Sequence, residues 1–100
     1  MTLTRTLRFV IPLIAALTVA GAAEAQCYAD YKAKRGQPMQ LHYGVIALPQ
    51  SACGSTGAAA AQIAPRLAAD GWQLLSVVSI FGQEGLASRQ GNAGAFFLRY

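Results

Sequence analysis

The sequence predicts a small α+β protein: an antiparallel sheet in the order β-β-α-β-β with one helix packed on it, after a cleaved signal peptide. Three observations predict this class. Alternating or apolar segments typical of strands occur at residues 28–34, 40–48, 72–81 and 95–100. One amphipathic helical segment covers about residues 57–70, between the second and third strands. The first quarter of the chain has the composition of an export signal.

The N-terminal segment shows the three parts of a secretory signal. Two arginines within the first eight residues precede an uncharged stretch over residues 9–23, and an A-x-A sequence ends at Ala25. We therefore predict cleavage between Ala25 and Gln26, which leaves residues 26–100 as one small domain. The apolar stretch is shorter than the roughly 20 residues of a spanning helix. We expect no stable membrane anchor after cleavage and a periplasmic or secreted location.

Cys27 and Cys53 are the two cysteines of the chain, and both lie in the predicted mature domain. Two cysteines in an oxidising compartment normally pair, so we predict a Cys27–Cys53 disulfide. A lipid-modified Cys27 would need leucine three residues earlier, where Glu24 stands. A redox-active pair would need a C-x-x-C spacing, which the sequence lacks.

The first two strands should form a hairpin. Residues 28–34 alternate, with Tyr28 and the charged residues on one side and Ala29, Tyr31 and Ala33 on the other, which favours an edge strand. Alanine and lysine also permit a helical turn here. Residues 35–38 (RGQP) indicate a turn, and residues 40–48 indicate the second strand, which Pro49 ends. Such a hairpin returns the chain from Cys27 toward Cys53, in agreement with the predicted disulfide.

The helix has recognisable ends. Ser55 or Thr56 can cap its N-terminus, and Gly71 is suited to its C-terminal cap. Pro65 lies inside the segment, where it removes one backbone hydrogen bond and crowds the preceding turn. We therefore predict a kink or break near residues 61–65.

The last third of the chain is predicted as a hairpin. Residues 72–81 (WQLLSVVSIF) are apolar on both sides, which favours a central strand covered on both faces. Residues 82–94 contain four glycines and indicate a long loop before the closing strand at 95–100 (AFFLRY). One helix covers only one face of the sheet. A second copy, another envelope protein or the N-terminal hairpin should therefore cover the other face.

Charge gives a weaker indication of partners. The mature domain has six basic and three acidic side chains, a net charge of +3, which is too little for a nucleic-acid surface. Aromatic and basic residues interleave at Tyr28, Tyr31, Lys32, Lys34 and Arg35. This segment is a candidate site for an anionic envelope polymer or a lipid headgroup. Lysines on an edge strand also prevent aggregation, which is the alternative interpretation.

His42 is the only histidine and defines the alternative hypothesis of a small enzyme or metal-dependent factor. A Ser/His/Asp set can be assembled from Ser76 or Ser79, His42 and Asp30, but no G-x-S-x-G elbow exposes either serine. Three scattered acids offer few partners for a metal ion. We predict no catalytic residue, metal or cofactor. A deep polar pocket at His42 would favour an enzyme, and a flat apolar sheet face would favour a binding module.

Two passages carry a family resemblance: the helix followed by Gly71-Trp72-Gln73-Leu74-Leu75-Ser76-Val77, and Phe96-Phe97-Leu98-Arg99-Tyr100. They resemble a widespread domain-of-unknown-function family that runs strand, helix, Gly-Trp-x-Leu strand and aromatic-x-Leu-Arg/Lys strand. The whole mature chain is also similar to small exported, uncharacterised proteobacterial proteins, including residues 27–34 (CYADYKAK) and 41–45 (LHYGV). The resemblance implies the fold and brings no activity, cofactor or catalytic residue. We expect an exported binding or interaction module that binds itself or another envelope protein.

Overall fold

The computed structural model describes residues 25–100, so the predicted signal peptide lies outside the described residues. The strands are β1 (Cys27–Arg35), β2 (Gln40–Leu48) and β3 (Gln73–Phe81), and the α-helices are α2 (Thr56–Ala68) and α3 (Ala87–Ala93). Short 3-10 helices occupy η2 (Gln50–Ala52), η3 (Gln83–Gly85) and η4 (Gly94–Phe96). The strands form one antiparallel sheet in the order β2-β1-β3. The predicted α+β class is therefore confirmed.

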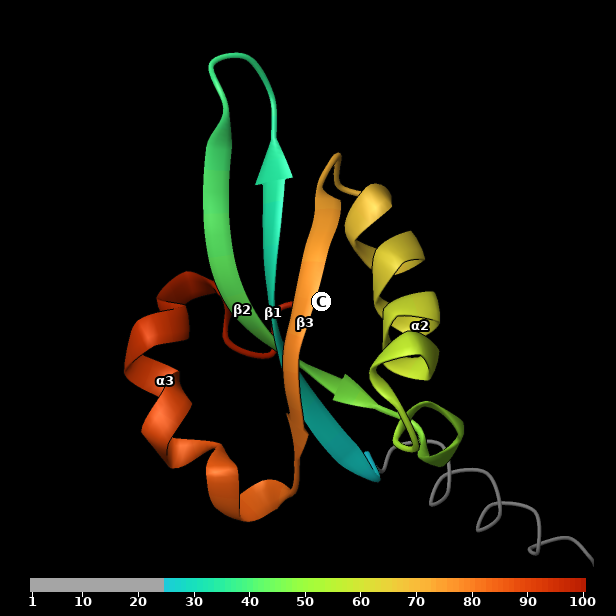
Figure 1. The fold of residues 1–100 in the computed structure, drawn as a ribbon. Helices are drawn as coiled ribbons and strands as arrows, with labels where there is room; N and C mark the ends of the chain where they lie inside the picture. The colour runs from blue at the N-terminus through green and yellow to red at the C-terminus, as the bar shows by residue number, and fades with distance from the viewer. Residues whose placement is uncertain (1–24) are drawn as a thin grey trace, which may run out of the picture.

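The two α-helices lie on opposite sides of the sheet (Figure 1). α2 packs on the face that carries the alternate β1 residues Ala29, Tyr31 and Ala33, all fully buried. Ile63 and Leu67 of α2 meet them in the same core cluster. α3 lies against the second face, near the end away from the β1–β2 hairpin tip (Figure 1). The sheet is thus covered differently on its two sides.

α2 has the predicted ends. The Ser55 hydroxyl accepts a hydrogen bond from the Ala58 amide at 3.0 Å, and Gly71 turns the chain out of the helix with a φ of +81°. One continuous α-helix runs through Pro65, so the predicted break is wrong. Ala61 and Pro65 are both exposed, so water can bind the carbonyl that proline leaves without a donor.

The strand positions differ from the prediction, because β1 is central and β3 is an edge strand. Asp30, which suggested a solvent-facing side of β1, is 4% exposed and is paired with Arg89 of α3. Leu75 and Val78 of β3, which suggested cover on both faces, are about half exposed. They lie where the β1–β3 register shifts, and such bulges are common on edge strands.

The predicted closing strand does not form in the described part of the chain. Residues 82–94, predicted as a loop, form η3 and α3 instead. Phe97 makes one isolated parallel bridge to Val45, and the Leu98 amide donates to the Val45 carbonyl at 2.8 Å. The chain then reaches the α2 side of the sheet, where the Tyr100 hydroxyl donates to the Asp70 carboxylate. Tertiary packing therefore overrides the strand propensity of residues 95–100.

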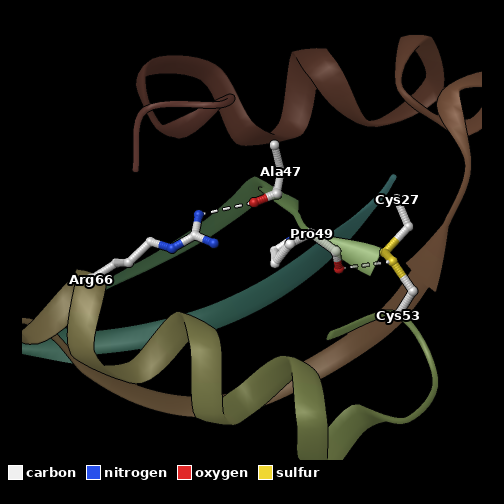
Figure 2. The surroundings of a disulfide bond; sticks show 5 residues. All are labelled: Cys27, Ala47, Pro49, Cys53 and Arg66. Atoms are coloured by element: carbon white, nitrogen blue, oxygen red, sulfur yellow. Dashed lines mark hydrogen bonds between the residues drawn. A yellow bond between two sulfur atoms is a disulfide. The ribbon is translucent and has the colours of Figure 1, made fainter. Parts of the chain in front are cut away.

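The predicted disulfide is confirmed, with Cys27 at the start of β1 bonded to Cys53 (Figure 2). Near it, the Arg66 guanidinium of α2 donates to the Ala47 carbonyl of β2 at 2.9 Å. The disulfide joins the β2–α2 connection to β1, and the Arg66 hydrogen bond joins α2 to β2. Within residues 25–100, no helix is long and apolar enough to cross a membrane.

Candidate functional site

His42 lies in an aromatic cluster on the α2 side of the sheet. Its ring stacks on Phe96, with 3.7 Å between the centroids, and meets the Trp72 ring edge-on at 4.2 Å. Its Nε2 atom is 2.9 Å from the Tyr31 hydroxyl oxygen. Within the described chain, His42 Nδ1 and Trp72 Nε1 are buried without a hydrogen-bond partner. The histidine thus joins β2 to the C-terminal segment.

The surroundings of His42 favour its neutral form. Burial, and then the positive charges of Arg35 and Arg99, lower the pKa of His42 below its usual 6.5. Arg35 covers the cluster, with its guanidinium carbon 4.1 Å from the Trp72 ring centroid. A neutral imidazole that is 9% exposed and packed between aromatic rings fits a structural role.

Tyr31 and Gly44 fit together beneath this cluster. The two residues are paired across β1 and β2, and a Cβ atom at position 44 would overlap the Tyr31 hydroxyl and ring. Burial, followed by the charge of Tyr100, raises the pKa of the Tyr31 phenol above its ordinary value of 10.0. The phenol therefore stays protonated, and glycine at position 44 leaves room for it.

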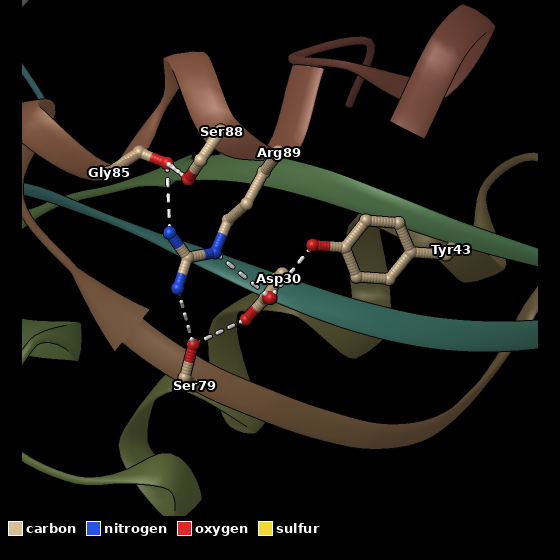
Figure 3. Close-up of polar contacts among 6 residues, drawn as sticks. All are labelled: Asp30, Tyr43, Ser79, Gly85, Ser88 and Arg89. Carbon is tan, nitrogen blue, oxygen red and sulfur yellow. Dashed lines mark hydrogen bonds and ion pairs between the residues drawn. The ribbon is translucent and has the colours of Figure 1, made fainter. Parts of the chain in front are cut away.

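A second polar cluster surrounds Asp30 on the α3 side (Figure 3). The carboxylate accepts hydrogen bonds from the Ser79 hydroxyl at 2.6 Å, the Tyr43 hydroxyl at 2.8 Å and Arg89 Nε at 3.1 Å. Burial raises the pKa of Asp30, but these hydrogen bonds and the Arg89 charge together hold it below its usual 3.8. Burial, then the bond to Asp30, raises the pKa of Tyr43 to about 12. The cluster fixes α3 to the sheet through an ionised, fully bonded carboxylate.

These two clusters separate the residues of the hypothetical triad. His42 lies on the α2 side, whereas Asp30 and Ser79 are bonded to each other on the α3 side. The sheet itself stands between the imidazole and the serine hydroxyl. Among residues 25–100, no group of three or more His, Cys, Asp or Glu side chains is placed to hold a metal ion.

The second sheet face is open beyond the part that α3 covers. A shallow groove of about 350 Å³ lies there, and its lining includes Lys32, Leu41, Tyr43 and Leu75. Strand alternation puts Lys32 and Tyr43 on the face that also carries Asp30, because the two residues are paired across β1 and β2. Leu41 is 64% exposed and Leu75 is 48% exposed. Large apolar side chains therefore line a groove that residues 25–100 leave uncovered.

A second groove of about 390 Å³ lies at the hairpin turn, with Lys34, Met39 and Gln73 in its lining. Met39 is 60% exposed, and Lys34 is paired with Leu41 across the hairpin. This pairing places the two grooves next to each other. We give the name hairpin patch to the lysines and exposed apolar residues that line them: Lys32, Lys34, Met39, Leu41 and Leu75.

The predicted anionic-surface residues are divided among three places. Lys32 and Lys34 lie in the hairpin patch. Arg35 lines the hairpin-turn groove beside Lys34 and donates to the Asp70 carbonyl at 3.0 Å. Tyr31 is buried in the core. Tyr28 lies at the other end of β1, where its ring stacks on Phe81 with 6.2 Å between centroids. The interleaved pattern therefore does not form one continuous surface.

Sequence reasoning did not find the apolar part of the patch. The alternation of β2 puts Leu41 on the same face as Lys34, and this signal was available in the sequence. The exposure of Met39 and Leu41 depends on where α3 ends, which strand patterns do not reveal.

Comparison with protein-family models, with curated proteins and with solved structures finds no match for this chain. The family resemblance therefore stays an expectation, and only the residues of the site bear on function.

Proposed function

We propose that this protein is an exported binding module, periplasmic or secreted, that binds its partner through the hairpin patch. The observation that supports this is the exposure of Leu41 and Leu75 on a sheet face that α3 covers only in part, together with the exposure of Met39 in the adjoining hairpin turn. Exposed apolar side chains gathered beside a groove are typical of interaction sites. Export is supported by the Cys27–Cys53 disulfide, because such bonds persist in oxidising compartments.

The lysines of the patch favour a partner other than a second copy. In a twofold pair through the hairpin patch, Lys32 and Lys34 of each copy would lie against the same surface of the other. Like charges brought together beside buried apolar surface weaken such an interface. We therefore favour a partner of complementary charge, with a homodimer as the competing arrangement.

Site-specific photo-crosslinking tests the proposal. A photoreactive amino acid replaces Leu41 in the full chain, which is produced with its leader in cells that export it. The matched control replaces Val78, which is 49% exposed and lies outside the hairpin patch. We expect adducts from position 41 and none from position 78. Absence of adducts at position 41, or equal labelling at both positions, would contradict the proposal.

A further inference from the structure

We propose that the hairpin patch binds an anionic phospholipid bilayer, with the hairpin tip in the interface and the lysines at the lipid phosphates. This inference rests on the proposed function, because it names the partner of the same surface. A second copy of the chain and an acidic protein are the competing partners.

The shape of the molecule suits a planar surface. The β1–β2 hairpin extends beyond β3 and beyond the end of α2 (Figure 1). Met39 and Leu41 lie at this extremity, and both are more than half exposed. Apolar side chains at a protruding tip can enter a membrane interface without a clash from the rest of the fold. Each large apolar side chain transferred from water into the interface adds affinity in proportion to its buried area.

The charges lie at the depth that such insertion requires. Lys34 is paired with Leu41, and Lys32 is paired with Tyr43. The two lysines are therefore level with positions two and four residues beyond Met39 along the chain. Those steps correspond to roughly 7 and 13 Å along a strand. An interfacial element buries its apolar face about 5–10 Å deep, and lysine side chains extend back to the headgroups. The tip would therefore reach the acyl boundary while both ammonium groups stay among phosphates.

No acid of the described chain neutralises these lysines. The ion pairs within residues 25–100 are Arg35–Asp70 and Arg89–Asp30. The other mature acid, Glu84, lies in η3, which follows the end of β3 farther from the hairpin tip. An anionic bilayer offers a matching partner for this surface. Its acyl region accepts the apolar tip, and its negatively charged headgroups pair with the two lysines.

Vesicle sedimentation tests the inference with the processed protein, residues 26–100. The probes are phosphatidylcholine vesicles with and without phosphatidylglycerol. We expect binding to the anionic vesicles and little to the neutral ones, with affinity that falls as salt rises. Lys32→Gln with Lys34→Gln should weaken binding roughly 25-fold, since each lysine near an anionic surface contributes about fivefold. Leu41→Ser should weaken it about tenfold through lost apolar burial.

Matched controls change similar residues outside the patch. Val78→Ser removes an apolar side chain that is 49% exposed, and Arg99→Gln removes an exposed cation near the C-terminus. Both should leave binding within about twofold of the unmodified protein, and thermal melting should show that every variant is folded.

Equal binding to neutral vesicles, no binding, or equal losses in the controls would overturn the inference. A protein adduct at position 41 without vesicle binding would overturn the lipid partner alone, whereas no adduct would contradict the proposed function.

Discussion

Arg89 in α3 joins Asp30 in β1 across 59 positions of sequence, with Nε 3.1 Å from the carboxylate. The Asp30 side chain is 6% exposed and that of Arg89 is 28% exposed, so the pair is largely removed from water. Arg89 also donates to the Gly85 carbonyl at 2.8 Å and covers the Phe81 ring at 3.9 Å. One side chain therefore holds a short helix on the sheet.

Arg89→Leu should destabilise the protein by roughly 3 kcal/mol, because it leaves a buried carboxylate without its cation. The free energy of unfolding in urea measures this loss. Asp30→Asn combined with Arg89→Leu should cost less than the sum of the single changes, since the double variant buries no unpaired charge. Additive effects would show that the ion pair does not couple α3 to β1.

Gly44→Ala should destabilise the fold by about 1–3 kcal/mol, because the added methyl group overlaps the Tyr31 phenol in a closely packed core. Gly57→Ala in α2 is the matched control, since its Cβ would meet only the Ser55 hydroxyl at 3.9 Å. In a helix, glycine to alanine should be neutral or stabilising by up to about 1 kcal/mol. Equal urea midpoints for the two variants would contradict the proposed contact.

Local signals predicted the hairpin, α2 and the disulfide well. Ser55, Gly71 and Pro49 mark element ends through backbone chemistry that depends on neighbouring residues only. Cys27 and Cys53 need only an oxidising compartment and a hairpin that returns the chain. These features can be predicted from the sequence because their causes are local.

The order of the strands and the C-terminal third depend on contacts distant in sequence. Asp30 looked solvent-exposed, because nothing in its own strand reveals that Arg89 would cover it. Residues 95–100 have strand propensity, yet Phe96 stacks on His42 and that packing decides their conformation. The hairpin patch was predicted only in part. Its lysines are apparent in the sequence of β1, whereas the exposure of Leu41 depends on how far α3 extends over the sheet.

Cleavage after Ala25 stays a prediction, since residues 1–24 lie outside the described chain. The intact mass of protein recovered from the envelope or medium should correspond to a chain that begins at Gln26, with or without cyclisation to pyroglutamate. A membrane-held product that begins at Met1 would contradict it.

Replacing both cysteines tests how much the disulfide stabilises this small sheet. Cys27→Ala with Cys53→Ala should lower the free energy of unfolding by about 2–5 kcal/mol. The double change avoids an unpaired thiol, and non-reducing peptide mapping of the unmodified protein should recover the linked peptides. Free thiols at both positions in exported protein would contradict the pairing.

Stability should fall on mild acidification because of His42. Its pKa is lowered in the folded protein, so below about pH 6.5 the unfolded chain takes up a proton that the folded chain does not. Unfolding then becomes more favourable as the pH falls, with a slope of at most about 1.4 kcal/mol per pH unit for one proton. The effect ends once the pH passes the lowered folded pKa.

His42→Phe should remove this pH dependence, because phenylalanine can stack on Phe96 and cannot be protonated. Trp72 is the only tryptophan and touches the His42 ring, so its fluorescence can follow unfolding in urea at each pH. Asp30 responds at lower pH, since its folded pKa lies below 3.8, and the two windows are therefore separable. The slope, and not the absolute stability, is the readout, because the variant also removes the partner of the Tyr31 hydroxyl. An unchanged slope between about pH 7 and 5 would show that His42 is not the source of the pH dependence of stability.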